Sequence, residues 1–162
     1  MENQQNGHKR RVRYSGTHPK RYQEKYKELH PEKYLDTVSR VIQKGSTPAG
    51  MHISICVKEI LDFLQIQPGQ NGLDATLGYG GHTLEMLKCL EGKGHIHALD
   101  VDPIESEKTK ARLAGLGYGP EILTVRLQNF AEIDQVAAEA GKFDFVLADL
   151  GVSSMQIDNP ER

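Results

Sequence analysis

The chain has 162 residues, of which 38% are hydrophobic and 26% are charged, proportions typical of a globular domain. No apolar run approaches the roughly 20 residues that a membrane-spanning helix needs, and the N-terminal sequence MENQQNGHKRRVRY lacks the apolar core of a secretory signal. Cys56 and Cys89 have no metal-ligand spacing, and we interpret them as small buried residues of a reducing compartment. We therefore expect a cytoplasmic protein with no membrane partner.

Charge is distributed unevenly along the chain. Residues 1–50 hold 11 Lys and Arg against 5 Asp and Glu, a net of +6, whereas residues 51–162 hold 9 against 17, a net of −8. This asymmetry favours a polyanion partner bound through the basic segment, the alternative being a solvated tail that binds nothing. We predict that residues 1–50 form a partly disordered, partly helical extension and linker, and that residues 51–162 form the folded domain.

Within 51–162, predicted helices alternate with predicted strands. Val57, Ile60, Leu61 and Leu64 form a helical stripe. Further helices are predicted over 82–90, from Pro103 to about Leu113 behind an Asp102 cap, and over 131–140 before Gly141. Strands are predicted over 71–78, 95–100, 122–129 and 143–150, the last apolar enough to be buried in a parallel sheet.

This alternation indicates βαβ units and hence an α/β fold with a doubly wound parallel sheet. Right-handed crossovers then place the loop after the first strand at the carboxyl edge of the sheet, where such sheets bind ligands.

That loop is glycine-rich, in the stretch LDATLGYGGHT at 73–83. Gly78, Gly80 and Gly81 allow a tight turn and a close approach to a ligand, and the helix that begins near His82 directs its N–H groups toward it. Asp100 ends the next strand, where a carboxylate can accept both hydroxyl hydrogens of a ribose. The pattern predicts a nucleoside-bearing cofactor, the alternative being a tight turn beside an ordinary strand-end Asp.

Two cofactors remain open on these residues. The lysine and Ser/Thr of a P-loop are absent, which disfavours a nucleoside triphosphate. NAD and S-adenosylmethionine both carry adenosine, but Asp74 can meet the ammonium group of the latter and would face a pyrophosphate badly. Asp149, in DLGVSSMQID, lies at the same predicted edge, where a catalytic polar group is expected; alternatively it caps backbone N–H groups.

The combination of DATLGYGGHT, ALDVDP, QNF and DLGVSSMQIDNPER, in this order and spacing, closely resembles the RsmH (MraW) family over roughly residues 52–162. The resemblance implies a Rossmann-like class I methyltransferase that uses S-adenosyl-L-methionine. It also implies a substrate, the exocyclic N4 of a cytidine in the decoding region of bacterial small-subunit ribosomal RNA, and hence the small ribosomal subunit as partner.

The resemblance carries the family's site residues onto this chain. Phe130 is expected against the adenine, and Asp149 is expected to be catalytic as well as cofactor-binding. His52 matches an early family histidine, with helix capping as the alternative, while His95 and His97 are interpreted as structural, with no metal site. The implied cofactor-binding residues are Gly80, Gly81, His82, Asp100, Phe130, Asp149 and Gln156.

The chain also departs from the family pattern. Val101 stands where the family usually has Arg, and residues 1–50 lie outside the common family core. The family continues beyond the position of Arg162 with a Gly-Phe-Ser-Phe-like segment, a helical insertion for RNA and further strands. We therefore expect an N-terminal fragment whose incomplete sheet exposes an edge that promotes homo-oligomers. The alternatives are an inactive RNA-binding fragment that uses the KRRVR segment, and an NAD-binding oxidoreductase.

Overall fold

In the computed structural model of the chain, the structure is described for residues 54–152 and 157, all within the unit Met51–Arg162. The extension and linker expected over 1–50, as well as His52 and Gln156, lie outside the described residues. The domain boundary after residue 50 therefore stays a prediction.

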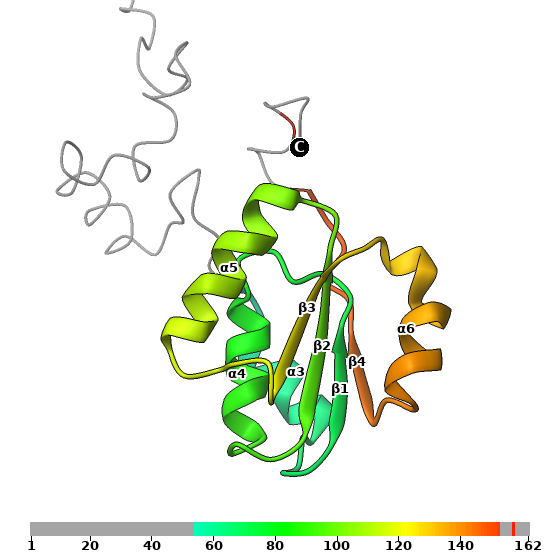
Figure 1. Ribbon diagram of the computed structural model, residues 1–162. Helices are drawn as coiled ribbons and strands as arrows, with labels where there is room; N and C mark the ends of the chain where they lie inside the picture. Colours follow the sequence, from blue (N-terminus) through cyan, green and yellow to red (C-terminus); the bar gives the residue numbers. More distant parts are fainter. Residues whose placement is uncertain (1–53, 153–156, 158–162) are drawn as a thin grey trace, which may run out of the picture. The chain divides into compact units, whose positions relative to one another are not determined.

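A four-stranded parallel sheet forms the centre of the described domain (Figure 1). Its strands are β1 (Asn71–Asp74), β2 (His95–Asp100), β3 (Leu123–Leu127) and β4 (Phe145–Leu147), in the spatial order β3-β2-β1-β4. All neighbouring pairs are parallel, so the carboxyl ends of the four strands meet at one edge of the sheet.

Helices cover both faces of this sheet. Helices α3 (Val57–Leu64), α4 (Gly81–Cys89) and α5 (Pro103–Gly115) lie on one face, and α6 (Ile133–Ala140) lies on the other (Figure 1). The predicted α/β class and doubly wound arrangement are thereby confirmed. None of the helices within residues 54–152 is long and apolar enough to cross a membrane.

Local sequence explains where α5 and α6 begin. Asp102 caps α5, with its Oδ1 accepting from the N–H groups of Ile104 and Glu105, and Pro103 takes the first helical position. The predicted helix over 131–140 starts later than expected, because residues Phe130–Glu132 form a short 3₁₀ helix, η2. The side chain of Asn129 caps that turn by accepting from the N–H of Ala131 at 2.9 Å.

The sheet separates two hydrophobic layers. The smaller layer, under α6, contains Leu73, Leu99 and Val136, all fully buried. The larger layer lies on the α4 and α5 face, and its buried residues are Ile66, Leu77, Met86, Leu87, Leu90, Ile96, Ala98, Leu113, Ile122, Leu123 and Phe145.

Two sequence-based predictions are wrong in this region. The fourth strand is predicted to be buried over 143–150, but β4 spans only Phe145–Leu147 and Val146 is 49% exposed, because β4 is an edge strand of the described sheet. The cysteines were expected to be buried, but Cys56 is exposed and Cys89 is only partly buried.

Candidate functional site

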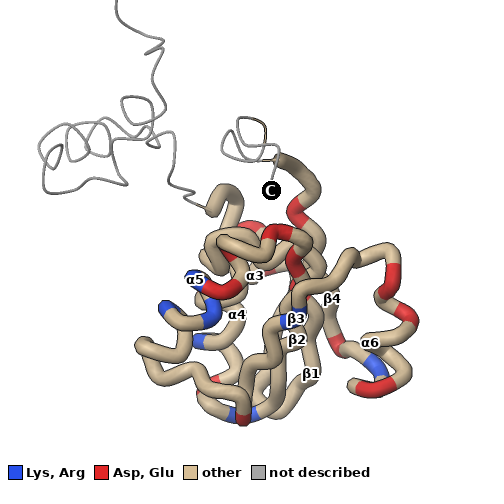
Figure 2. Tube along the Cα trace, turned by 45° about the horizontal axis from the view of Figure 1, so that its top comes forward, with Lys and Arg blue, Asp and Glu red and all other residues tan. Residues whose placement is uncertain are grey.

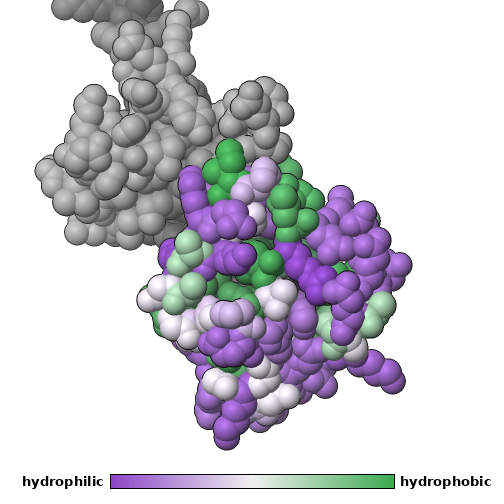
Figure 3. Space-filling view, in the orientation of Figure 1, coloured by the Kyte–Doolittle hydropathy of each residue, from purple (hydrophilic) through white to green (hydrophobic). Residues whose placement is uncertain are grey.

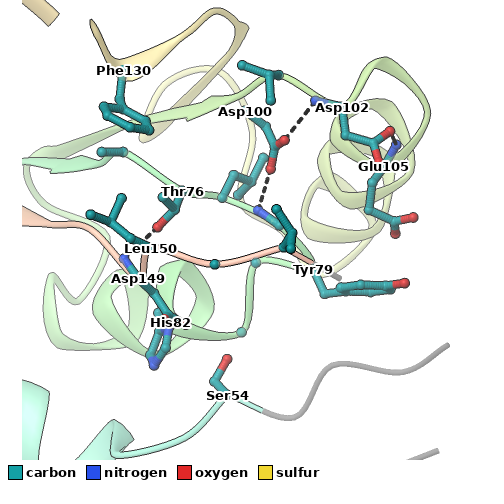
Figure 4. Close-up of a pocket in the computed structure, with 18 of the residues that line it drawn as sticks. Ser54, Thr76, Tyr79, His82, Asp100, Asp102, Glu105, Phe130, Asp149 and Leu150 are labelled. Atoms are coloured by element: carbon teal, nitrogen blue, oxygen red, sulfur yellow. Dashed lines mark hydrogen bonds and ion pairs between the residues drawn. The ribbon is translucent and has the colours of Figure 1, made fainter. Parts of the chain in front are cut away.

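A pocket of about 260 Å³ opens at the carboxyl edge of the sheet (Figure 4). Its walls come from five parts of the chain that are far apart in sequence. The contributing segments are Ser54, the glycine loop 75–82, residues 100–102 with Glu105, residues 128–130, and residues 149–152.

Two glycines of the loop are required by the packing of the protein itself. Gly80 caps α4 with a φ of 64°, and a Cβ at this position would lie 2.6 Å from Cγ2 of Thr109. A Cβ on Gly81 would lie 2.1 Å from Oγ of Ser54. These close approaches bring α5 and the segment before α3 against the loop, and they leave the pocket wall free of loop side chains at both positions.

Asp100 lies in the pocket wall with its carboxylate fixed at both oxygens. Oδ2 accepts from the N–H of Gly78 at 2.6 Å, and Oδ1 accepts from the N–H of Asp102 at 2.8 Å (Figure 4). Because each carboxylate oxygen can accept more than one hydrogen bond, the fixed group retains acceptor capacity toward the pocket.

Asp74 occupies a different environment from the one expected. It is 1% exposed and does not line the pocket. Its Oδ1 accepts from the N–H of Thr76 at 3.0 Å, and its Oδ2 accepts from the hydroxyl of Thr83 at 2.5 Å. Burial raises the pKa of the Asp74 carboxyl above its ordinary value. The hypothesis that Asp74 contacts a ligand's ammonium group is therefore wrong. Asp74 instead holds the glycine loop through its hydrogen bonds to Thr76 and Thr83.

His82 and Asp149 face each other across the pocket floor. His82 is 8% exposed, with Nε2 at 2.9 Å from the carbonyl oxygen of Ile55 and Nδ1 at 3.8 Å from Oδ2 of Asp149. The N–H of Asp149 donates to Oγ1 of Thr76 at 2.7 Å. His82 thus points into the protein rather than into solvent.

Phe130 and several aliphatic side chains supply the apolar part of the rim. Phe130 is 46% exposed and lines the pocket, so it is not a core residue. Val101, Leu150 and Val152 also line it and are more than half exposed. Figure 3 shows apolar surface at this end of the described residues.

Acidic residues dominate the charge of the pocket. Asp100, Asp102, Glu105 and Asp149 line it, and its lining contains no Lys or Arg among the residues that the structure describes. Figure 2 shows acidic positions along the loops at this end of the sheet, whereas basic positions gather on α5.

Apart from Asp74, the structure brings together the described residues that the sequence singled out for this site, with Gly78 beside those carried over from the family. These are Gly80, Gly81, His82, Asp100, Phe130 and Asp149. Sequence reasoning missed Ser54, Thr76 and Glu105. Only Thr76 carried a signal, since it lies inside the glycine-loop motif.

A parallel sheet with a glycine loop and a strand-end acid at its carboxyl edge is a Rossmann-like fold, the class of fold that binds nucleoside-bearing ligands at that edge. The chain belongs to the MraW methylase family, whose match covers residues 49–162.

Curated relatives agree with this assignment over nearly the whole chain. The chain is 74% identical over 161 residues to "Ribosomal RNA small subunit methyltransferase H 1" of Lachnoclostridium phytofermentans, covering 99% of this chain and 44% of that relative. It is 70% identical over 162 residues to "Ribosomal RNA small subunit methyltransferase H 2" of Alkaliphilus metalliredigens, covering 100% of this chain and 46% of that relative. The chain therefore spans less than half the length of these relatives.

Among solved structures, the chain is similar in fold to the one titled "Crystal Structure of PH0851". The TM-score is 0.54 at 23% sequence identity, covering 68% of this chain and 25% of that chain. This likeness concerns the fold alone.

Proposed function

We propose that this chain forms the S-adenosyl-L-methionine-binding part of a methyltransferase that modifies the N4 of a cytidine in small-subunit ribosomal RNA. Family membership and the names of the relatives support the reaction class and the RNA substrate. The observation that carries the cofactor assignment is the charge of the pocket.

An acidic pocket suits a cationic cofactor. S-adenosylmethionine bears a sulfonium and an ammonium group, both attracted by carboxylates of the lining such as those of Asp100 and Asp149. The pyrophosphate of NAD is an anion that would lie beside the carboxylates of Asp100 and Asp149, and the described lining offers no Lys or Arg to add to the first N–H groups of α4 in neutralising it. The same pocket therefore disfavours an NAD-dependent oxidoreductase.

The residues present fit the parts of this cofactor. Asp100 has acceptor capacity left for the ribose hydroxyls, and the exposed ring of Phe130 can stack on the adenine. Helix α4 begins at Gly81 without a side-chain cap, so its first N–H groups can donate to the carboxylate of the methionine moiety. Gln156, outside the described residues, stays a predicted contact.

The bound cofactor would supply a methyl group already activated by its sulfonium, so the protein's main task is alignment. The cytosine amine is a weak nucleophile because its lone pair conjugates with the ring. The side chain of Asp149, which is 45% exposed, or the carbonyl of Leu150 accepts a hydrogen bond from this amine and favours the tetrahedral geometry needed for attack. The base must leave its stack to reach this pocket.

Calorimetric titration of this chain with S-adenosylmethionine and with NAD tests the cofactor. We expect the first to bind and the second not to. Asp100→Asn removes the charge of the group that accepts the ribose hydroxyls, together with one of its two acceptors for backbone N–H groups, and should weaken binding about tenfold. Asp134→Asn, at an exposed acid in the first turn of α6, is the matched control. Binding of NAD, or equal affinity of the Asp100 variant, would contradict the assignment.

A hybrid protein tests the reaction and the substrate. Residues 1–162 replace the aligned segment of the Lachnoclostridium relative, and the hybrid is given small ribosomal subunits that lack the modification. We expect N4-methylcytidine in the digested RNA by mass spectrometry. A hybrid that folds and binds the cofactor but methylates another atom would exclude the proposed N4 position.

The basic segment 1–50 is proposed to bind RNA phosphates, because its net charge of +6 is opposite in sign to that of the phosphates. Filter binding of small-subunit ribosomal RNA across a salt series compares this chain with a version that starts at Met51. We expect weaker binding and a shallower salt dependence without the segment. Identical affinity and slope would dismiss a role in binding.

A further inference from the structure

The segment after β4 is joined to the glycine loop by a side-chain hydrogen bond. The N–H of Asp149 donates to Oγ1 of Thr76 at 2.7 Å, between residues 73 positions apart in the sequence (Figure 4). Both residues line the pocket. The bond therefore connects two walls of the same site.

Thr76 is itself held in place by buried groups. Its N–H donates to Oδ1 of Asp74 at 3.0 Å, and Oδ2 of the same carboxylate accepts from the hydroxyl of Thr83 at 2.5 Å. Asp74 is 1% exposed and Thr83 is fully buried. A continuous polar chain thus runs from the first turn of α4 through the end of β1 to the segment after β4.

Among the described residues, few other polar contacts hold that segment, and the nearest backbone bond is the one from the Ala75 N–H to the Leu147 carbonyl at 2.8 Å. Strand β4 ends at Leu147, and Asp149, Leu150 and Val152 are exposed. Within residues 54–152, no second hydrogen bond ties 149–152 to the glycine loop, and the other polar contact is the 3.8 Å approach of Asp149 to His82. Among the described contacts, the Thr76 hydroxyl is therefore the group that bonds the main chain of Asp149.

We propose that Thr76 is the positioning residue for Asp149. Its hydroxyl accepts the Asp149 N–H and so fixes both the carboxylate and the Leu150 peptide at the pocket wall. This inference rests on the proposed function, because it assigns a task to the same cofactor pocket.

Two variants at Thr76 separate the hydroxyl from the shape of the side chain. Thr76→Val keeps the shape and removes the acceptor, whereas Thr76→Ser keeps the acceptor. Thr124→Val is the matched control, because the Thr124 hydroxyl bonds Nε2 of His95 at 2.8 Å and does not line the pocket. Amide hydrogen exchange at Asp149 and calorimetric affinity for S-adenosylmethionine are measured on the 162-residue chain.

In Thr76→Val we expect the Asp149 amide to exchange about tenfold faster and the cofactor affinity to fall about fivefold, the effect of one hydrogen bond. Thr76→Ser should restore both values, and Thr124→Val should match the wild type in both. Unchanged exchange of the buried-strand amides of Ile96 and Ala98 shows that the variant is folded. If the valine variant does not fold, Thr76→Ala removes the same acceptor.

Wild-type exchange at Asp149 in the valine or alanine variant would overturn the inference, as would a serine variant that fails to restore it. A wild-type chain that does not bind S-adenosylmethionine would instead count against the proposed function. In that case, the exchange rate of the Asp149 amide in the Thr76 variants still tests whether Thr76 positions Asp149.

Discussion

The imidazole Nε2 of His82 lies 2.9 Å from the carbonyl oxygen of Ile55. Because a carbonyl oxygen only accepts hydrogen bonds, Nε2 carries a proton and donates it. This contact joins the first turn of α4 to the residues before α3, the same region where Ser54 packs against Gly81. One wall of the pocket therefore depends on His82.

Substitution of His82 should reveal this contact as a loss of stability. His82→Ala removes the donor and the buried ring, and we expect the free energy of unfolding to fall by about 1–2 kcal/mol. His82→Gln places an amide N–H near the position of Nε2 and should lose less. Urea unfolding measures both, and equal losses in the two variants would show that the hydrogen bond to Ile55 is unimportant.

Alanine substitutions at Gly80 and Gly117 should distinguish the cost of backbone strain from the cost of a steric clash. Both have positive φ, 64° and 93°, but a Cβ on Gly80 would lie 2.6 Å from Thr109 whereas a Cβ on Gly117 would meet nothing within 4 Å. Gly117→Ala should cost about 1 kcal/mol of unfolding free energy from backbone strain alone. Gly80→Ala should cost at least twice as much, as measured by thermal or urea unfolding. Equal costs would mean that α5 moves away from the loop without penalty.

His97 should make stability depend on pH. Burial lowers the pKa of the His97 imidazole below 6.5, and the neighbouring His95 and Arg126 lower it further, against a smaller opposite effect of Glu139. The folded chain therefore binds this proton less readily than the unfolded chain, so stability falls as pH drops below about 6.5. His97→Gln should remove this part of the slope between pH 8 and pH 5 in urea midpoints. An unchanged slope would assign the dependence to other groups.

Local sequence patterns predicted those helices and strands whose ends are set by neighbouring residues. The Asp102 and Pro103 pair located the start of α5, and the alternation of strands and helices gave the parallel sheet. The extent and burial of β4 could not be predicted in this way, because its position at the edge of the described sheet is set by tertiary pairing.

The same distinction holds for the site. The glycine and acid motifs predicted that Gly80, Asp100 and Asp149 lie at the pocket, because residues of these types recur at a fixed spacing along the chain. The reason that Gly80 must be glycine is a contact with Thr109, and the tether of Asp149 is Thr76, 73 positions away. Neither contact could be predicted from neighbouring residues, because each joins positions that are far apart in the sequence.

Asp149→Asn tests the proposed catalytic carboxylate in the hybrid protein. Asparagine keeps the size of the side chain and the backbone N–H that donates to Thr76, but its neutral amide oxygen accepts a weaker hydrogen bond from the cytosine amine than the carboxylate does. We expect the rate of methyl transfer at saturating cofactor to fall about tenfold, the difference between a charge-assisted and a neutral hydrogen bond, with cofactor affinity reduced less than the rate. Asp134→Asn serves again as the control for loss of one acidic charge. A wild-type rate in the Asp149 variant would leave the Leu150 carbonyl as the acceptor for the amine hydrogen.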